Sequence, residues 1–148
     1  MAWVSVGSLN TGQDKTAGTT VTSGTIGTAM AVGSVIVVTV ACDNTGTTDA
    51  VSTEVTSVTA STGSNTFIKA AEYRNGQGGV AAGAVVSLWY CQLTSALATS
   101  ATITANFANT KTASAISSWG FTKRAGTTIS VDATTNTDTD GGVLASAA

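Results

Sequence analysis

The chain has 148 residues, of which only 9% are charged, and its formal net charge is −2. Soluble domains carry about 25% charged residues, so here Thr, Ser, Ala, Gly and Val take many positions that Lys and Glu usually occupy. Six scattered Lys and Arg residues give no clustered basic face for nucleic acid, and the longest apolar run is about half of the ~20 residues that span a bilayer. We therefore expect a single domain over residues 1–148 that binds neither nucleic acid nor membranes.

The first third of the chain predicts β-strands. β-Branched residues and Gly dominate, and apolar residues recur with period two or in short runs, which is typical of strands. Short strands are expected at Trp3–Ser8 and Thr19–Ile26, with a loop at Asn10–Lys15. The clearest strand is Ser34–Cys42, with one buried face formed by Ile36, Val38, Val40 and Cys42.

The middle of the chain continues this pattern after a turn-forming segment, Asp43–Asp49. Strands are predicted at Val55–Ala60 and Phe67–Tyr73, with Ser61–Asn65 as the hairpin connection between them. Another turn is predicted at Arg74–Gly79.

The last third predicts strands at Val85–Leu93, Thr102–Phe107, Ala115–Thr122 and Thr128–Asp132. The second of these alternates clearly, with Ile103, Ala105 and Phe107 on one side. The polar and then small apolar residues of Asp132–Ala148 are typical of a terminal tail.

Many short strands without helical crossovers predict an all-β protein, an antiparallel β-sandwich. A jelly roll is favoured over an immunoglobulin-like arrangement, although periodicity alone does not choose between them. The chain has no Pro and few charges, which commonly guard sheet edges. We therefore expect neighbouring subunits to close the edges.

The residues that carry chemistry are sparse. There is no His, so the usual general base and metal ligand are missing, and the acidic residues are scattered. A calcium site formed by Asp43, Asn44, Asp49 and Glu54 is an alternative, but the segment lacks a calcium-loop pattern and turn chemistry is favoured. We expect no catalytic residues, no metal and no cofactor, and hence a protein that is not an enzyme.

The two cysteines, Cys42 and Cys91, lie in apolar strand segments and are expected to be buried free thiols. If their strands were neighbours, a disulfide would be the alternative, but synthesis in a reducing cytoplasm argues against it.

Aromatic residues are the candidate contact groups. Trp89 and Tyr90 are adjacent, so on a strand they point to opposite faces and at most one is in the core. Trp119 shares its face with Phe121 and is predicted to be a core residue. Trp3, near the N-terminus, is the candidate exposed anchor onto a neighbouring subunit.

The N-terminus and the composition point in different directions. Low charge and many Thr, Ser and Gly residues are typical of extracellular β-proteins and particle shells, yet the first ten residues lack the basic and apolar regions of a secretory signal. A virion component satisfies both observations, because it is made in the host cytoplasm and released by lysis.

Four segments carry a resemblance to a known group of proteins. They are Gly33–Ala41, Val58–Phe67, Ser87–Cys91 and Ala115–Phe121. Their order resembles β-sandwich modules, jelly-roll-like in form, that are common in tailed-phage structural proteins, most like capsid decoration or cement proteins, and in some bacterial surface proteins. The resemblance covers about residues 33–134. It departs at Ala60, where those modules usually have an acidic residue.

This resemblance implies a virion structural protein rather than a chemistry. The expected function is decoration or cementing of a bacteriophage capsid, with the major capsid protein as partner and a homo-oligomer as the assembled form. A trimer would suit sites between capsomers. The alternative is a tail or head-fibre module that binds host surface glycans through Trp89 or Trp119. A bacterial surface or pilus-like subunit is a third hypothesis, against which the missing export signal argues.

Overall fold

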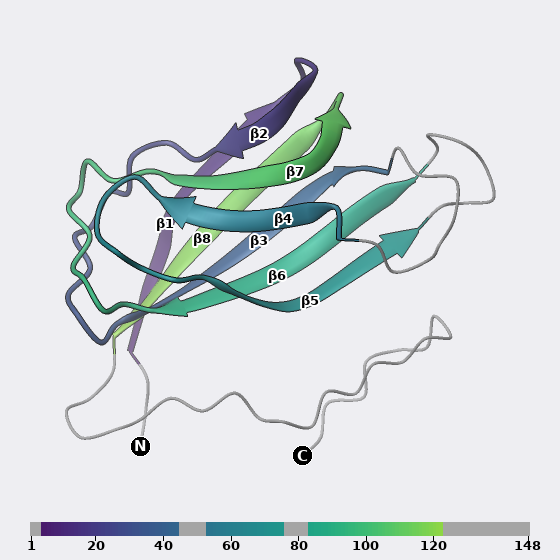
Figure 1. The fold of residues 1–148 in the computed structure, drawn as a ribbon. Helices are drawn as coiled ribbons and strands as arrows, with labels where there is room; N and C mark the ends of the chain where they lie inside the picture. The colour runs from purple at the N-terminus through teal and green to yellow at the C-terminus, as the bar shows by residue number, and fades with distance from the viewer. Residues whose placement is uncertain (1–3, 45–52, 76–82, 123–148) are drawn as a thin grey trace.

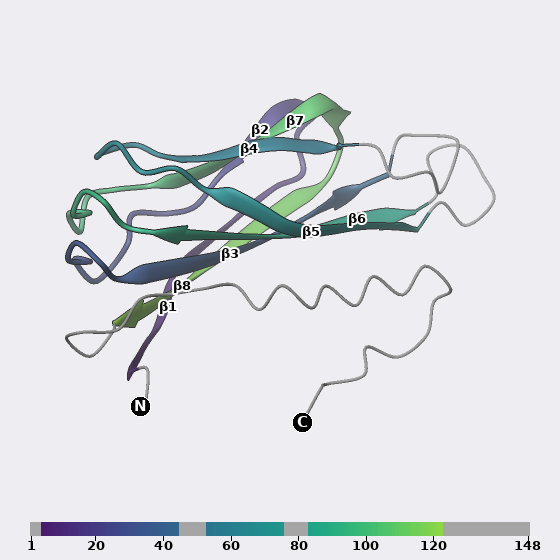
Figure 2. The same cartoon turned by 60° about the horizontal axis from the view of Figure 1, so that its bottom comes forward.

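The computed structural model describes residues 4–44, 53–75 and 83–122. Within these ranges the chain forms eight strands and no helix, and therefore no helix that could cross a membrane. The strands form two antiparallel sheets that stack face to face, as Figure 1 and the turned view in Figure 2 show. The predicted all-β antiparallel sandwich is confirmed.

The larger sheet has five strands in the order β1-β8-β3-β6-β5, and the smaller has three in the order β2-β7-β4. The strands are β1 (Val4–Asp14), β2 (Gly18–Thr22), β3 (Val35–Asp43), β4 (Val55–Ala60), β5 (Ile68–Asn75), β6 (Ala84–Gln92), β7 (Ile103–Lys111) and β8 (Ser114–Thr122). The interleaved order means that residues from both halves of the chain meet in each sheet. The choice between a jelly roll and an immunoglobulin-like sandwich stays a prediction.

The predicted loop at Asn10–Lys15 is wrong for most of its length. β1 runs from Val4 to Asp14 and pairs with β8 along this length, with Asp14 opposite Ser114. The polar side chains of Asn10–Asp14 resemble those of a loop, but an edge strand tolerates them because much of its surface stays in water. The strand predicted at Trp3–Ser8 was therefore too short.

The hairpin predicted at Ser61–Asn65 is also wrong. β4 pairs with β7 and β5 pairs with β6, so this segment crosses from the smaller sheet to the larger one. Asn65 holds the crossing in place, because its Oδ1 accepts hydrogen bonds of 3.0 Å from the backbone N–H groups of Thr94 and Ser95. The segment does connect two strands, as its composition predicts, but the partner of each strand is set by long-range packing.

The predicted strand Thr19–Ile26 ends early, since β2 stops at Thr22. Ile26 is nevertheless fully buried, and its N–H donates a 2.8 Å hydrogen bond to the carbonyl of Ala101. The strand predicted at Thr128–Asp132 and the C-terminal tail lie outside the described residues.

The core lies between the two sheets and follows the predicted alternation. The four residues assigned to the buried face of β3, and Ile103, Ala105 and Phe107 of β7, are at most 8% exposed. On β8 the inward position opposite Ile36 is Gly120, where a Cβ would come within 3 Å of the side chains of Leu9 and Met30. These two larger side chains therefore fill the space above the glycine.

Cys42 and Cys91 are both buried and free, as predicted. Register explains why they do not pair: Cys91 lies opposite Ile36, six residues along β3 from Cys42. At about 3.4 Å per residue, this separates them by about 20 Å, far beyond the ~7 Å limit for the Cα atoms of a disulfide.

The outer strands of both sheets have irregular registers. Pairings of β1, β2, β4 and β5 contain register shifts, whereas the pairings of the central strand β3 with β6 and β8 are continuous. Bulges at an edge oppose pairing with another chain, because they disrupt the regular ladder of backbone donors and acceptors. The expectation that neighbouring subunits close these edges stays a prediction.

Candidate interaction surface

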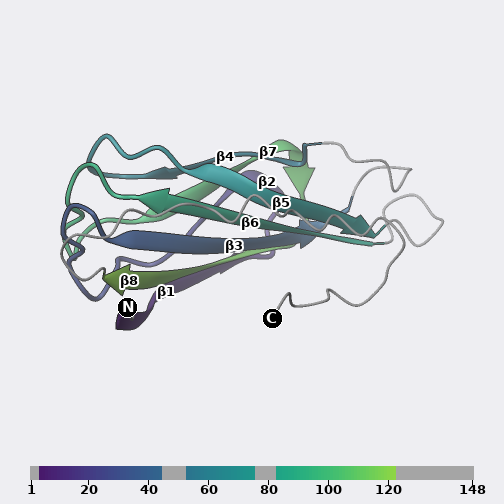
Figure 3. The ribbon, with the colours of Figure 1, turned by 90° about the horizontal axis from the view of Figure 1, so that it is seen from below.

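The solvent side of the five-stranded sheet is the most distinctive surface of the described chain, and we call it the outer sheet face. Figure 3 views it from outside, with β1, β8, β3, β6 and β5 side by side in front of the smaller sheet. Strand pairing aligns its side chains in three rows across the sheet. They are the ridge row (Ser8, Trp119, Val37, Tyr90 and Ile68), the middle row (Thr11, Ser117, Thr39, Leu88 and Ala71) and the hollow row (Gln13, Ala115, Ala41, Val86 and Tyr73).

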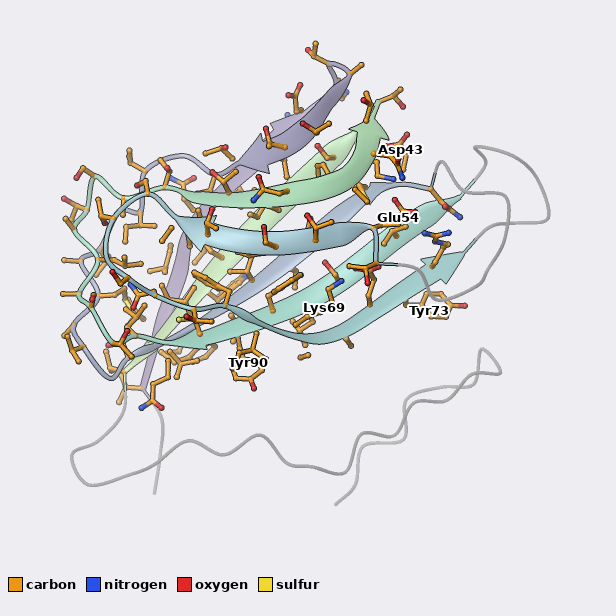
Figure 4. All side chains as sticks on the ribbon, in the orientation of Figure 1. Asp43, Glu54, Lys69, Tyr73 and Tyr90 are labelled. Carbon is orange, nitrogen blue, oxygen red and sulfur yellow. The ribbon has the colours of Figure 1, made fainter. Side chains whose placement is uncertain are left out.

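None of the residues in these three rows is charged. Several large apolar side chains among them are substantially exposed, namely Ile68 (50%), Tyr73 (58%), Val86 (51%), Leu88 (39%) and Trp119 (45%). Tyr73 and Tyr90 point away from the smaller sheet in Figure 4. An uncharged surface with several exposed large apolar side chains is typical of a contact site.

The face is not uniform in relief. The ridge row carries two large aromatic residues, Trp119 and Tyr90, whereas a hollow lies over the neighbouring rows. Small side chains of Thr39, Ala41 and Ala115 line the hollow, together with residues of β1 and β6. Small residues on the central strands thus leave a depression beside an aromatic ridge.

The prediction that Trp119 is a core residue is wrong, because 45% of this residue is exposed. Its shared face with Phe121 was assigned correctly, but that face is the outer one. The inward positions of β8 are Ile116, Ser118 and Gly120, which leave room for side chains from other segments. Both faces of this sheet are apolar, so alternation did not reveal which one is buried.

Trp89, in contrast, is 5% exposed and faces the core. Its indole Nε1 donates a 3.0 Å hydrogen bond to the hydroxyl of Ser87, and the Lys69 amine lies 5.1 Å from the ring centroid. Tyr90 points to the opposite face, as predicted for adjacent strand residues. Of Trp89 and Trp119, therefore, only Trp119 is accessible to an external partner. Trp3, the predicted anchor, lies outside the described residues.

Charged side chains gather instead at the end of the sandwich where β3 and β7 end and β4 begins. Glu54 Oε2 accepts a 2.6 Å hydrogen bond from Lys111 Nζ, and Glu54 Oε1 accepts one from the Arg74 guanidinium. All three side chains are at most 6% exposed. Figure 4 places Glu54 close to Asp43 at this end. The two cations neutralise the buried carboxylate, which would otherwise be very unfavourable.

Glu72 links the two sheets at the side where β4 and β5 do not pair. From β5 its carboxylate accepts hydrogen bonds from the backbone N–H groups of Glu54 (2.7 Å) and Val55 (3.2 Å) at the start of β4. It also accepts a 2.7 Å bond from Lys69 Nζ. A side chain thus supplies the acceptors that a neighbouring strand would otherwise give.

Asp43 has a similar structural role. Its carboxylate accepts hydrogen bonds from the N–H (3.1 Å) and hydroxyl (2.9 Å) of Thr112 and from the N–H of Ala113 (3.3 Å), which fixes the β7–β8 turn. Burial alone would raise the pKa of Asp43, but these hydrogen bonds outweigh it and hold the pKa below the ordinary value.

Burial also raises the pKa of the Cys42 thiol to about 11, despite the opposing effect of Lys111.

These contacts also bear on the calcium alternative. Asp43 is occupied by the β7–β8 turn and Glu54 by two cations, while Asp49 lies outside the described residues. Within the described ranges, no three His, Cys, Asp or Glu side chains form a group that could hold a metal ion. Turn and packing chemistry account for Asp43 and Glu54.

The buried ion cluster of Glu54, Arg74 and Lys111 was not predicted from the sequence. Its members lie far apart in the chain, at the ends of strands that pair with different neighbours. One signal was present: Lys69 and Glu72 interrupt the predicted strand Phe67–Tyr73 in a chain that has few charged residues elsewhere. Arg74, which was assigned to a turn, belongs to the same strand, because β5 extends to Asn75. In such a chain, charges within a strand are candidates for buried pairs.

No protein-family model matches this chain, and searches among characterised proteins and among solved structures find no match either.

Proposed function

We propose that this protein is a non-enzymatic structural component of a bacteriophage virion that decorates or cements the capsid. The observation that carries the proposal is the outer sheet face, where no row contains a charged residue although five large apolar residues are substantially exposed. Such a surface fits contact with protein better than contact with nucleic acid, which requires cationic groups. The low overall charge and the resemblance to phage modules supply the virion context.

The proposed mechanism is the summation of modest contacts. Each copy would cover its apolar face against a neighbouring protein, and many copies on one shell would resist its expansion together. The irregular edge strands favour association through a face rather than through strand pairing. Because the three rows of the outer sheet face contain no charged residue, these contacts would depend little on salt. In this proposal the protein is made in the host cytoplasm and resides in the virion.

A jelly roll is the proposed form of the sandwich. In a jelly roll, a long folded ribbon pairs the first strand with the eighth, the second with the seventh and the third with the sixth. The pairs β1–β8, β2–β7 and β3–β6 follow this scheme. β5 departs from it, because it pairs with β6 instead of β4.

The test is the copy number of this protein in purified phage particles, measured by quantitative mass spectrometry relative to the major capsid protein. A near-stoichiometric ratio is expected, and particles depleted of the protein should burst more readily on heating or osmotic shock. A handful of copies per particle would move the protein to the tail or fibres, and its absence would overturn the proposal.

Glycan binding is the second candidate function, and the exposure of Trp119 favours it. The indole lies between Ser8 and Val37 on an uncharged face that also carries Ser117 and Thr39. An exposed aromatic ring beside hydroxyl groups is suited to stacking on a sugar. A glycan array with wild type and Trp119→Ala tests it: binding that the variant loses while staying folded supports this function, and a silent array rejects it.

A further inference from the structure

We propose that the outer sheet face binds a second copy of the same chain, forming a two-fold symmetric dimer with the two five-stranded sheets face to face. This inference rests on the proposed function, which takes the outer sheet face as the contact surface. It adds that a second copy of the chain is the first partner to cover that face. The relief, the size and the charge of the face support it.

The relief of the face is self-complementary on its central strands β8 and β3. Consider a two-fold axis that lies above the middle row, parallel to the sheet and perpendicular to its strands. This axis would place each strand over the same strand of the other copy, running in the opposite direction. The ridge row of one copy then lies over the hollow row of the other. Trp119 of one copy meets Ala115 of the other on β8, and Val37 meets Ala41 on β3. These two alanines line the hollow, so large side chains enter a space that small ones leave.

The size of the face suits a stable dimer. Five strands about 4.8 Å apart and about 30 Å long present roughly 700 Å², close to the ~800 Å² per partner of a standard interface. The continuous register of β8, β3 and β6 keeps the centre regular, as needed for two sheets to pack about 10 Å apart at an angle near 30°.

The absence of charged residues from the three rows favours a contact between two identical faces. In such a dimer, each residue of the middle row faces the same residue of the other copy, so any charge there would repel itself. The middle row consists of Thr11, Ser117, Thr39, Leu88 and Ala71. The charged side chains of Glu54, Arg74 and Lys111 lie in the buried cluster instead.

The test uses Leu88, which lies in the middle row and is 39% exposed, so that a polar replacement leaves the core intact. Analytical ultracentrifugation of the full chain should give twice the 14.5 kDa chain mass for wild type, with little dependence on salt. Leu88→Lys and Leu88→Glu should each weaken the dimer about tenfold or more. An equal mixture of the two variants should restore it, because opposite charges then meet.

The control is Thr59, an exposed position of β4 in the smaller sheet, where Thr59→Lys should leave the dimer unchanged. Ala115→Arg, which blocks the hollow, is a second variant at an exposed site should Leu88 variants fail to fold. Monomeric wild type up to millimolar concentration would overturn the inference and leave the capsid protein or the chain's own residues 123–148 as the occupant. A trimer, or a dimer that resists the Leu88 and Ala115 variants, would overturn it as well. None of these outcomes changes the copy number in particles, which tests the proposed function separately.

Discussion

Lys111 Nζ lies 2.6 Å from Glu54 Oε2, and neither side chain is more than 5% exposed. This ion pair joins the last residue of β7 to the residue before β4, and the Arg74 guanidinium completes the contact from β5. These three charged side chains thus lie at one end of the sandwich, where they hold the two sheets together, while the three rows of the outer sheet face contain no charged residue.

Removing one member of this cluster is expected to destabilise the fold strongly. Lys111→Met should lower the free energy of unfolding by about 3–5 kcal/mol, because a buried carboxylate loses one of its cations. Urea unfolding followed by tryptophan fluorescence measures the change. Lys15→Met, at an exposed position, is the matched control and should change stability by less than about 0.5 kcal/mol. Equal effects of the two substitutions would contradict a structural role of the cluster.

Asp43 is expected to make stability depend on pH in the acid range. Its pKa in the folded protein lies below the unfolded value near 3.8, so the unfolded chain binds the proton more readily. The contribution of Asp43 is therefore fully present above the unfolded pKa and is lost as pH falls through the folded pKa. The stability advantage of wild type over Asp43→Asn should shrink below about pH 4, as measured by urea unfolding between pH 2 and 7. A difference independent of pH would show that the carboxylate charge is not involved.

The Cys42 thiol is expected to be unreactive in the folded protein. Its pKa of about 11 leaves almost no thiolate at pH 8, and the residue is only 5% exposed. Alkylation by iodoacetamide, followed by mass spectrometry, should be slow in buffer and rapid in urea. Cys91, whose pKa burial also raises, should behave in the same way. Rapid modification of either thiol without denaturant would contradict the predicted packing.

The two described tryptophans should respond to substitution in opposite ways. Trp89→Ala should cost about 3–5 kcal/mol of stability, because it empties a core position and removes the bond to Ser87. Trp119→Ala should cost little stability and instead weaken self-association. Thermal unfolding and sedimentation of both variants distinguish these effects. A large loss of stability with Trp119→Ala at a concentration where the chain is monomeric would place that residue in the core after all.

Local patterns predicted the strands well and their partners poorly. The alternation of Ile36, Val38, Val40 and Cys42 identified both β3 and its buried face, because those side chains meet the second sheet directly. Ser61–Asn65 has the composition of a hairpin, yet it joins strands of different sheets. Strand pairing depends on contacts between distant segments, which local composition does not record.

The surface was also only partly predictable. Low charge indicated a surface suited to contact, but the sequence could not show that Glu54, Arg74 and Lys111 meet at one end of the sandwich, because they are far apart in the chain. Trp119 was assigned to the wrong side because β8 is apolar on both faces, and the inward glycine at position 120 gave the only hint.

Hydroxyl-radical footprinting of purified particles tests the central claim most directly, namely that the outer sheet face is the contact surface of an assembled shell. Oxidation of Trp119 and Tyr73, which are 45% and 58% exposed in the isolated chain, would be compared between dilute protein and intact particles. The account predicts strong protection of both residues in particles, with Trp89 unreactive in either state. Equal oxidation of Trp119 and Tyr73 in the two states would contradict it.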